Sequence, residues 1–473
     1  MGASGGLPFR LMSTTKHFDE FLGSLAGVVG SRNLRYGEGI AEDYSHDEAL
    51  GETWQMPLAV VFPETTEQVA AITALASSSG TPLVARGSGT GLSGGAVPTS
   101  TSVVVSFERM AEVLEVDTVN HVVVVQPGVT LAALDECLAE IGFVYPVFPG
   151  ELGSTLGGNI ATNAGGMRAV KYGVTRHQVL GLEFVLASGE VMRSGGKFVK
   201  SSSGYDLVQL ITGSEGTLAL VTEITLRIYP RPEFTTTLLV PFSNVAAVCS
   251  SVPEVLGSGA LPLIMEYMDA AGLAAMGARV GLETGVPEAV QQLAKAYLFI
   301  ILEDSKSERL EDEIELVSEL LLQLGALDVY LLGDAAAAKL LEARESAFWV
   351  SKSLGANDIV DVVVPRGEIP LYLDKVARIA SDSGSFISAA GHVGDGNVHF
   401  SVFQPDVIKR FEVIREMLNY GLALGGAISA EHGIGSEKRE YLLELEDPQK
   451  LELMRRIKRA FDPAGILNPG KVF

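Results

Sequence analysis

Two short stretches of this 473-residue chain concentrate side chains that could hold a metal ion. The first, from Gly391 to His399, reads Gly-His-Val-Gly-Asp-Gly-Asn-Val-His, and Glu431-His432-Gly433 follows further along. Three of the chain's seven histidines are in these stretches, together with a carboxylate. Two imidazoles and one carboxylate suit a divalent metal that keeps open positions. We therefore predict a metal site made by His392, His399 and Glu431.

The residues around these histidines predict a hairpin, a helix and a further strand. Residues 386–390 and 399–403 are typical of strands, and residues 394–397 between them include glycine and asparagine, which tolerate positive φ. A tight reversal there would bring His392 and His399 within reach of one another. Apolar residues three or four apart predict a helix over 405–424, and a short strand over 427–430 would deliver Glu431 and His432.

Glu431 and His432 are expected to have different roles. Neighbours in an extended chain point to opposite sides. We therefore assign Glu431 to the metal and leave His432 as a general base, since an imidazole titrates near neutral pH. The alternative is that these are structural histidines beside a glycine-rich turn. A lone histidine would favour that alternative, whereas the whole set favours a site.

The composition is that of a globular chain with two or more domains or subdomains, with 52 glycines and 47% apolar residues. The net charge of −23 argues against a nucleic-acid partner, because phosphate backbones need a basic surface. Cys137 and Cys249 are too few for an iron–sulfur cluster or a disulfide framework.

The composition also bears on location. No run of eighteen apolar residues exists, so we expect no membrane span. Residues 1–16 lack the apolar core of a signal peptide. The expected location is the cytoplasm, with peripheral membrane attachment through a partner left open. Whether Met1–Leu11 is native is also open, because Met12 is another possible start.

The first of two glycine-rich stretches follows a predicted strand over 82–85 and runs from Arg86 to Gly95. Its glycines match GxGxxG, the Rossmann dinucleotide fingerprint, but that fingerprint must open a helix. Here residues 96–100 and then a predicted strand over 102–106 follow, so we reject a Rossmann fold. The backbone N–H groups of this loop could still form an anion-binding nest for a pyrophosphate.

The second glycine-rich stretch, which we also expect to be a loop, runs from Gly153 to Gly166. A third element, Gly213–Glu223, leads into an alternating strand over 224–228. A flexible surface linker is a poor interpretation of the first two stretches, because both lie between apolar elements. Two such stretches instead indicate a large cofactor that is held at several points.

These motifs, with Gly157-Gly158-Asn159 and the C-terminal stretch from Phe461 to Lys471, resemble the FAD-linked oxidases of the vanillyl-alcohol oxidase/p-cresol methylhydroxylase superfamily. The chain is most similar to the glycolate oxidase FAD subunit, D-lactate dehydrogenases and D-2-hydroxyglutarate dehydrogenase. The resemblance implies an α+β fold with a two-part FAD-binding domain, formed by residues 1–232 (core about 54–232) and a returning segment 426–473. A substrate cap over 233–425, with an antiparallel sheet and flanking helices, would lie between them.

The resemblance also implies FAD, bound non-covalently because the first loop lacks the histidine that tethers the flavin in some relatives. The first loop would hold the pyrophosphate, the second would lie along the ribityl and isoalloxazine portion, and the backbone near Val221 would meet the adenine. The expected FAD-binding residues are Arg86, Gly87, Ser88, Gly89, Thr90, Gly91, Leu92, Gly153, Ser154, Thr155, Gly157, Gly158, Asn159, Ala161, Thr162, Asn163, Gly165, Gly166, Val221 and Asn468.

The expected reaction is oxidation of a D-2-hydroxy acid, of the D-lactate or glycolate type, to the 2-oxo acid. His432 would take the hydroxyl proton, a divalent metal (zinc, manganese or iron) would hold the hydroxyl and one carboxylate oxygen, and flavin N5 would accept the hydride. Arg344 matches a family arginine that binds the substrate carboxylate. The alternative is an ordinary exposed helix arginine between Glu342 and Glu345.

Two departures from the relatives bear on the substrate. D-2-hydroxyglutarate dehydrogenases use a lysine for the distal carboxylate, where this chain has Ile359, and an asparagine where this chain has Ser401. A second carboxylate would lack a partner and would meet an acidic neighbour in the stretch Asn357–Asp361. This favours a monocarboxylate such as lactate or glycolate, or one with an apolar tail.

Three other functions are open at this stage: D-2-hydroxyglutarate dehydrogenase, an alkyl-ether lipid synthase of the same superfamily, and a non-catalytic flavin-binding subunit. The acidic surface argues against the lipid synthase, and the retained histidines argue against the non-catalytic subunit. The electron acceptor is not determined. A quinone, a cytochrome, an electron-transferring flavoprotein and oxygen all fit. The oligomeric state is also open, with a homodimer as one option.

Overall fold

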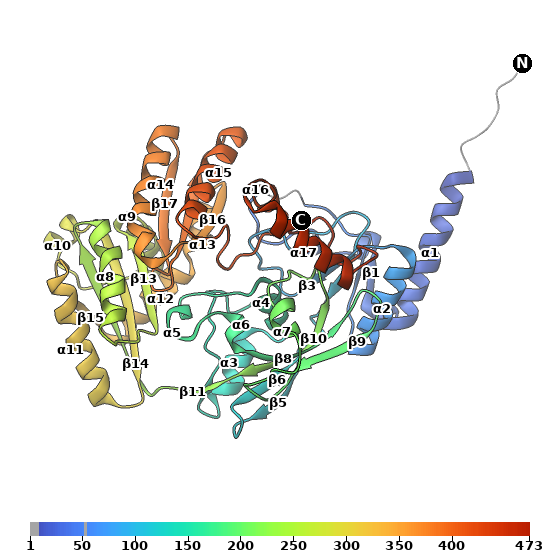
Figure 1. Cartoon of the computed structure of the whole chain (residues 1–473), viewed down its shortest axis with the longest axis horizontal. Helices are drawn as coiled ribbons and strands as arrows, with labels where there is room; N and C mark the ends of the chain where they lie inside the picture. Colours follow the sequence, from blue (N-terminus) through green and yellow to red (C-terminus); the bar gives the residue numbers. More distant parts are fainter. Residues whose placement is uncertain (1–8, 52–53) are drawn as a thin grey trace, which may run out of the picture.

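The computed structural model describes residues 9–51 and 54–473 and has two lobes joined near the C-terminal helices (Figure 1). One lobe contains a four-stranded and a five-stranded sheet, and the other is built on a seven-stranded sheet. In the part of the chain described, no helix is long and apolar enough to cross a bilayer. The architecture is the expected α+β fold.

The four-stranded sheet is formed by strands that lie between Leu34 and Ser106. Its order is β1 (Leu34–Tyr36), β2 (Ala59–Val61), β4 (Val103–Ser106) and β3 (Leu83–Arg86). Strands β2, β4 and β3 are parallel, and β2 and β4 are fully buried, as continuous apolar strands of parallel sheets are. Helices α1 (Phe9–Val29) and α2 (Thr66–Ser79) pack on this sheet, and 3-10 turns at Ser31–Asn33, Gly37–Gly39 and Glu42–Ser45 precede β2.

The five-stranded sheet is antiparallel. Its order is β5 (Val113–Asp117), β6 (Val122–Val125), β10 (Leu220–Arg227), β8 (Val179–Val185) and β9 (Val191–Gly195). Three helices pack in its core: α3 (Leu131–Ala139) through Leu134, α4 (Leu156–Thr162) through Ile160, and α7 (Leu207–Ile211) through Ile211. The remaining short elements are α5 (Ala169–Tyr172), α6 (Thr175–Gln178), and the paired β7 (Phe143–Val144) and β11 (Tyr229–Pro230).

The seven-stranded sheet forms the second lobe, which we call the cap, and it is antiparallel as expected. Its order is β15 (Tyr330–Leu332), β12 (Phe234–Phe242), β14 (Ala296–Asp304), β13 (Ile264–Asp269), β17 (Phe386–Gly391), β18 (Asn397–Phe403) and β16 (Asp358–Val363). Every pairing in this sheet is antiparallel.

Helices cover both faces of this sheet because its strands alternate. On β12, Leu238 and Val240 join one core and Leu239 the other. The first core includes α8 (Val245–Gly257), α11 (Ser307–Gln323), α14 (Ile369–Ser383) and α15 (Val407–Ala423). The second includes α9 (Ala270–Val280), α12 (Asp334–Glu345) and α13 (Ala347–Ser353), with α10 (Glu288–Leu293) packed beside them. A 3-10 turn at Arg366–Glu368 leads into α14.

The C-terminal segment returns to the first lobe. After α16 (Arg439–Leu445) and α17 (Pro448–Phe461), the backbone of Leu83 donates to Ile466 O at 2.8 Å. Ile466 and Leu467 are buried in the core of the four-stranded sheet, whereas Leu442 packs in the core of the cap. The C-terminal helices therefore lie between the two lobes (Figure 1).

Two local predictions need correction. The strand predicted over 427–430 is only an isolated bridge between Ala427 and Val363. The second glycine-rich stretch is not a loop throughout, because Thr155 caps a short helix, α4, by accepting a hydrogen bond from the Gly158 N–H. The first stretch behaves as expected, since no helix follows β3 before β4.

Candidate active site

A hairpin brings the two predicted metal-binding histidines together. β17 pairs with β18 so that Ala390 is opposite His399, and His392 lies just beyond the end of β17. The carbonyl of His392 accepts hydrogen bonds from the backbone of Asp395 and Gly396, at 3.0 and 3.2 Å. Gly396 has a φ of +98°, which only glycine adopts without strain. The predicted reversal is confirmed.

Glu431 reaches the same place from a turn that winds around Asp361. The buried carboxylate of Asp361, on β16, accepts hydrogen bonds from the backbone N–H groups of Ala430, Glu431 and His432, at 2.9, 2.8 and 3.1 Å. Lys438 donates to its other oxygen. Three consecutive N–H groups that point at one carboxylate cannot belong to an extended strand, which explains why the predicted strand does not form.

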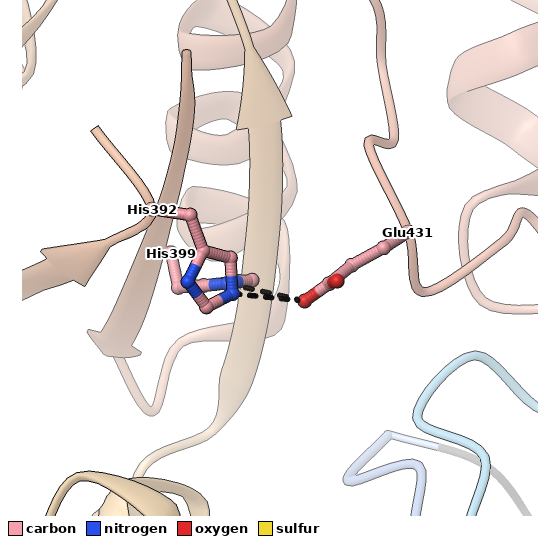
Figure 2. A group of neighbouring side chains, drawn as sticks. All are labelled: His392, His399 and Glu431. Atoms are coloured by element: carbon pink, nitrogen blue, oxygen red, sulfur yellow. Dashed lines mark hydrogen bonds and ion pairs between the residues drawn. The ribbon is translucent and has the colours of Figure 1, made fainter. Parts of the chain in front are cut away.

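The three predicted ligands converge on a small volume (Figure 2). Glu431 Oε1 is 3.4 Å from His392 Nε2 and 3.3 Å from His399 Nε2, and the three ligand atoms lie within 4.8 Å of one another. All three side chains are at most 15% exposed. Nitrogen and oxygen donors that face each other in this way fit a divalent metal ion.

His432 does not point away from Glu431, which contradicts the prediction of opposite sides. Its Nε2 is 3.8 Å from Glu431 Oε1, and its ring stacks on His399 with centroids 5.0 Å apart. The prediction was wrong because it assumed an extended chain. The ring's other nitrogen, Nδ1, is buried without a hydrogen bond, 3.6 Å from Asp361 Oδ1.

One buried carboxylate that the sequence analysis missed connects His392 to Arg344. Glu266, on β13, is completely buried, binds His392 Nδ1 with one oxygen, and accepts a hydrogen bond from Arg344 Nε at 2.6 Å with the other. A lone glutamate within the apolar stretch Ile264–Asp269 is the signal that could have revealed it.

Arg344 has a nitrogen left over. It lies in the last turn of α12, is only 9% exposed, and its Nη2 is buried without a partner. The alternative of an ordinary exposed helix arginine is therefore wrong. Arg344 lines a cavity, and a buried guanidinium N–H without a partner is suited to bind an anion.

The charges of the site are arranged by burial and by these carboxylates. Burial disfavours a charged ring, but Glu266 and Glu431 raise the pKa of His392 to about 10. A metal bound at Nε2 would therefore displace a proton, while Nδ1 keeps its hydrogen bond to Glu266. Burial lowers the pKa of His432 to about 4 despite the Asp361 carboxylate, so the ring is neutral at pH 7. Burial also raises the pKa of Glu431, but His392 and His399 outweigh it and hold that pKa well below its usual range.

A cavity of about 490 Å³ connects this cluster to the glycine-rich stretches. It contacts His392, His399, Glu431, His432 and Arg344 at one end. The predicted FAD-binding residues that line it are Gly87, Ser88, Gly89, Thr90, Gly91, Leu92, Ser154, Thr155, Gly158, Asn159, Ala161, Thr162 and Asn468. A smaller cavity adjoins it and is lined by Arg86, Gly157 and Val221, among others.

Several other predicted FAD-binding residues do not line the larger cavity but lie close behind residues that do. Arg86 lies beneath Gly89 and donates to the His46 carbonyl at 2.6 Å. Gly153 accepts a hydrogen bond from Ser88, and Asn163 ends α4. Gly165 and Gly166 pack too closely for a side chain, since a Cβ at Gly165 would lie 2.7 Å from Glu431 Oε2.

The glycine stretches fit a large anionic cofactor. The loop from Gly87 to Gly95 offers a side-chain-poor backbone to the cavity, and Gly89 has a φ of +76°. The sequence did not reveal the structural role of Glu215, which belongs to the Gly213–Glu223 motif. It is buried and accepts hydrogen bonds from the N–H groups of Ile434 and Gly435 at 2.8 and 2.7 Å, which ties the stretch after Glu431-His432 to the FAD-side wall.

The acidic neighbour predicted for a second substrate carboxylate is not found at the cavity. Neither Asp358 nor Asp361 lines it, and Asp361 is buried under the turn that it anchors. Ile359 and Ser401 do line the cavity, and the Ser401 hydroxyl is hydrogen-bonded to Ser351 at 2.8 Å.

Comparison with known proteins identifies two matching domain families. Residues 57–195 match the FAD binding domain, and residues 231–472 match the C-terminal domain of FAD linked oxidases. Similar proteins include a Mycobacterium tuberculosis protein described as an uncharacterized FAD-linked oxidoreductase, 50% identical over 96% of this chain and 99% of its own. The D-lactate dehydrogenase of Archaeoglobus fulgidus is 40% identical, over 87% of this chain and 90% of its own. The glycolate oxidase subunit GlcD of Bacillus subtilis is 37% identical, over 91% and 92% respectively.

Solved structures share the fold at low sequence identity. p-Cresol methylhydroxylase with bound substrate superposes with a TM-score of 0.81 at 18% identity, over 97% of each chain. Alkyldihydroxyacetonephosphate synthase superposes with a TM-score of 0.75 at 19% identity, over 95% of this chain and 84% of its own. These likenesses confirm the expected fold and carry no statement about activity.

Proposed function

The chain belongs to the FAD-linked oxidases, in the group that includes D-lactate dehydrogenase, glycolate oxidase and D-2-hydroxyglutarate dehydrogenase, and from this we propose that it oxidises a D-2-hydroxy monocarboxylic acid to the 2-oxo acid with the help of a divalent metal. One observation carries the proposal: the histidine cluster and Arg344, whose buried Nη2 has no hydrogen-bond partner, line the same cavity as the glycine-rich stretches.

In this proposal His432 removes the hydroxyl proton. Its Nε2 lies beside Glu431 at the cavity, and burial keeps the ring neutral at pH 7, as a general base must be. Asp361 Oδ1 lies 3.6 Å from the other ring nitrogen, and its charge favours the imidazolium that forms.

Arg344 would hold the substrate carboxylate. Glu266 already binds Nε and so fixes the guanidinium plane, while Nη2 remains available for an anionic oxygen. The carboxylate of Glu266 also fixes the ring of His392, so one buried side chain orients both a metal-binding residue and a substrate-binding residue.

His392, His399 and Glu431 would hold the metal, which when bound would supply a Lewis acid for the substrate hydroxyl. FAD, bound non-covalently, would supply the two-electron acceptor for the Cα hydride, which no side chain can supply. The two electrons would then pass from the reduced flavin to a separate acceptor, such as a quinone, a cytochrome or an electron-transferring flavoprotein.

The test is reduction of the FAD-loaded protein under anaerobic conditions. We expect D-lactate, glycolate or a larger D-2-hydroxy acid to bleach the flavin absorbance, and a chelator to abolish the bleaching until a divalent metal is restored. Absence of bleaching with every 2-hydroxy acid would contradict the proposed reaction. Bleaching that survives complete metal removal would contradict only the role of the metal.

A further inference from the structure

The wall of the cavity changes from polar to aromatic along β17 and β18. Side chains two residues apart on a strand share a face, and paired residues of neighbouring strands lie side by side. From the level of His399 and Ala390, the cavity face of this hairpin passes through Ser401 and Ser388 and ends at Phe403 and Phe386. Four residues of strand correspond to about 13 Å.

The intervening residues confirm which face is which. Phe400 and Val402 are buried in the opposite core, against α14 and α15, so His399, Ser401 and Phe403 must point to the cavity. The rings of Phe386 and Phe403 pack with their centroids 5.3 Å apart. On the neighbouring strand β16, Ile359 is opposite Ser401 and extends the apolar part of the wall.

Other apolar side chains that line the cavity come from α9 and from α13 with its C-terminal neighbour. Met276 comes from α9, and Phe348, Trp349 and Leu354 come from the α13 region. Trp349, Leu354 and Phe386 are 40%, 64% and 63% exposed. Large exposed apolar side chains that gather along one cavity are typical of a binding surface.

The serine hydroxyls of this region already have hydrogen-bond partners within the protein. The Ser401 hydroxyl is paired with Ser351 at 2.8 Å, and Ser388 donates to Asp269 at 3.3 Å. Among the cavity-lining residues that the structure describes, Arg344 is the only lysine or arginine, whereas the acidic Glu48, Glu151 and Glu345 also line the cavity. Lys352 is nearby but is paired with Glu48 at 2.6 Å.

We propose that this part of the cavity, from Ile359 and Ser401 to Phe386 and Phe403, is a subsite for a bulky apolar side chain of the 2-hydroxy acid. The inference rests on the proposed function and narrows it to acids with a branched aliphatic or aromatic side chain. The methyl group of lactate or the hydrogen of glycolate would leave these apolar walls in contact with water, and burial of apolar surface is favourable. For a second carboxylate, the described residues that line the cavity offer no lysine or arginine besides Arg344.

The test compares D-2-hydroxy acids of increasing size with the FAD-loaded protein. We expect kcat/KM and the anaerobic rate of flavin reduction to be at least about tenfold higher for D-2-hydroxyisocaproate or D-phenyllactate than for D-lactate or glycolate, since one methylene group alone is worth about 10–200-fold in a fitted pocket. D-2-hydroxyglutarate should be the poorest of the larger acids. The affinities of the matching 2-oxo acids, measured through the change that they cause in the spectrum of the oxidised flavin, should show the same order.

Two variants and a control locate the effect. Ile359→Lys should raise the ratio of kcat/KM for D-2-hydroxyglutarate to that for D-2-hydroxyisocaproate, while Leu371→Lys, at an exposed position of α14 outside the cavity, should leave it unchanged. Phe386→Ser, at a largely exposed position, should lower the ratio of kcat/KM for D-phenyllactate to that for D-lactate, while Leu371→Lys should leave this ratio unchanged.

The outcomes separate the two claims. If D-lactate and glycolate reduce the flavin but the larger acids do not, the apolar subsite is refuted and the proposed reaction stands. If Ile359→Lys and Phe386→Ser leave the order of substrates unchanged, the subsite is also refuted. If no 2-hydroxy acid reduces the flavin, the proposed reaction fails and this inference fails with it.

Discussion

Replacement of Asp361 by asparagine tests whether one buried carboxylate holds the catalytic turn. Asp361 accepts hydrogen bonds from three backbone N–H groups between Ala430 and His432, and from the Ser429 hydroxyl at 3.0 Å. It is also paired with Lys438, which is only 5% exposed. Asparagine has nearly the same shape but carries no charge, and its NH₂ group would face donors.

The magnitude follows from the burial of both partners. Loss of one member of a buried ion pair costs about 3–5 kcal/mol, because the other charge is left uncompensated. Each kcal/mol shifts the melting temperature of a domain of 150–250 residues by about 2–4 °C, so a fall in Tm of at least about 6 °C is expected. A displacement of about 1 Å at reacting groups costs about 100-fold in rate, so kcat should fall to a similar extent in the folded protein.

The assay combines thermal unfolding of the FAD-loaded protein with kcat measured well below Tm. The double variant Asp361→Asn with Lys438→Met removes the uncompensated charge, and should recover much of the stability without recovering kcat. Glu416→Gln is a matched control, because Glu416 and Lys375 form an exposed pair, which contributes at most about 1 kcal/mol. Asp361→Asn with unchanged Tm and unchanged kcat would refute the reasoning.

Four further substitutions test the remaining parts of the site. His432→Ala should lower kcat by about 100–10,000-fold with a much smaller effect on KM, as loss of a general base does; normal turnover would rule out that role. Arg344→Ala should mainly raise KM, and a pure kcat effect in steady-state kinetics would argue against carboxylate binding. Glu266→Gln should lower metal affinity by about 10–100-fold, measured by metal titration, because His392 loses its orienting carboxylate; unchanged affinity would contradict that link. Gly165→Ala should lower metal content, measured by elemental analysis, because its Cβ would lie 2.7 Å from Glu431 Oε2, whereas Gly27→Ala, with no atom within 4 Å of its Cβ, should retain the metal.

The hairpin and the fold show where sequence reasoning succeeds. The reversal between His392 and His399 is a local event, set by a glycine turn and by two alternating strands, so it could be read from a few residues. The glycine-rich loop after β3 was likewise predictable, since its residues lack helix-forming side chains and the next strand follows directly. The antiparallel cap was expected only from resemblance, because its strand order joins segments far apart in the chain.

The error at Glu431 and His432 shows where such reasoning stops. The residues before them have the composition of a strand, but the backbone turns because Asp361, seventy residues earlier, supplies one carboxylate for three N–H groups. Glu266 was missed for a related reason. The role of its carboxylate depends on its contacts with His392 and Arg344, which are 126 and 78 positions away in the sequence. The sheet and α12 bring these two residues to it.

The sequence by itself determined the residue types of the site: two imidazoles and a carboxylate for a metal, a third histidine, an arginine, and glycine stretches for a large cofactor. Tertiary structure decided which of these side chains face one another, which are neutral, and what surrounds them. The physical reason is that pKa values, unpaired donors and cavity walls depend on burial and on partners from distant segments. The aromatic end of the cavity beyond His399 could therefore be recognised only when β16, β17, β18 and α13 were seen together.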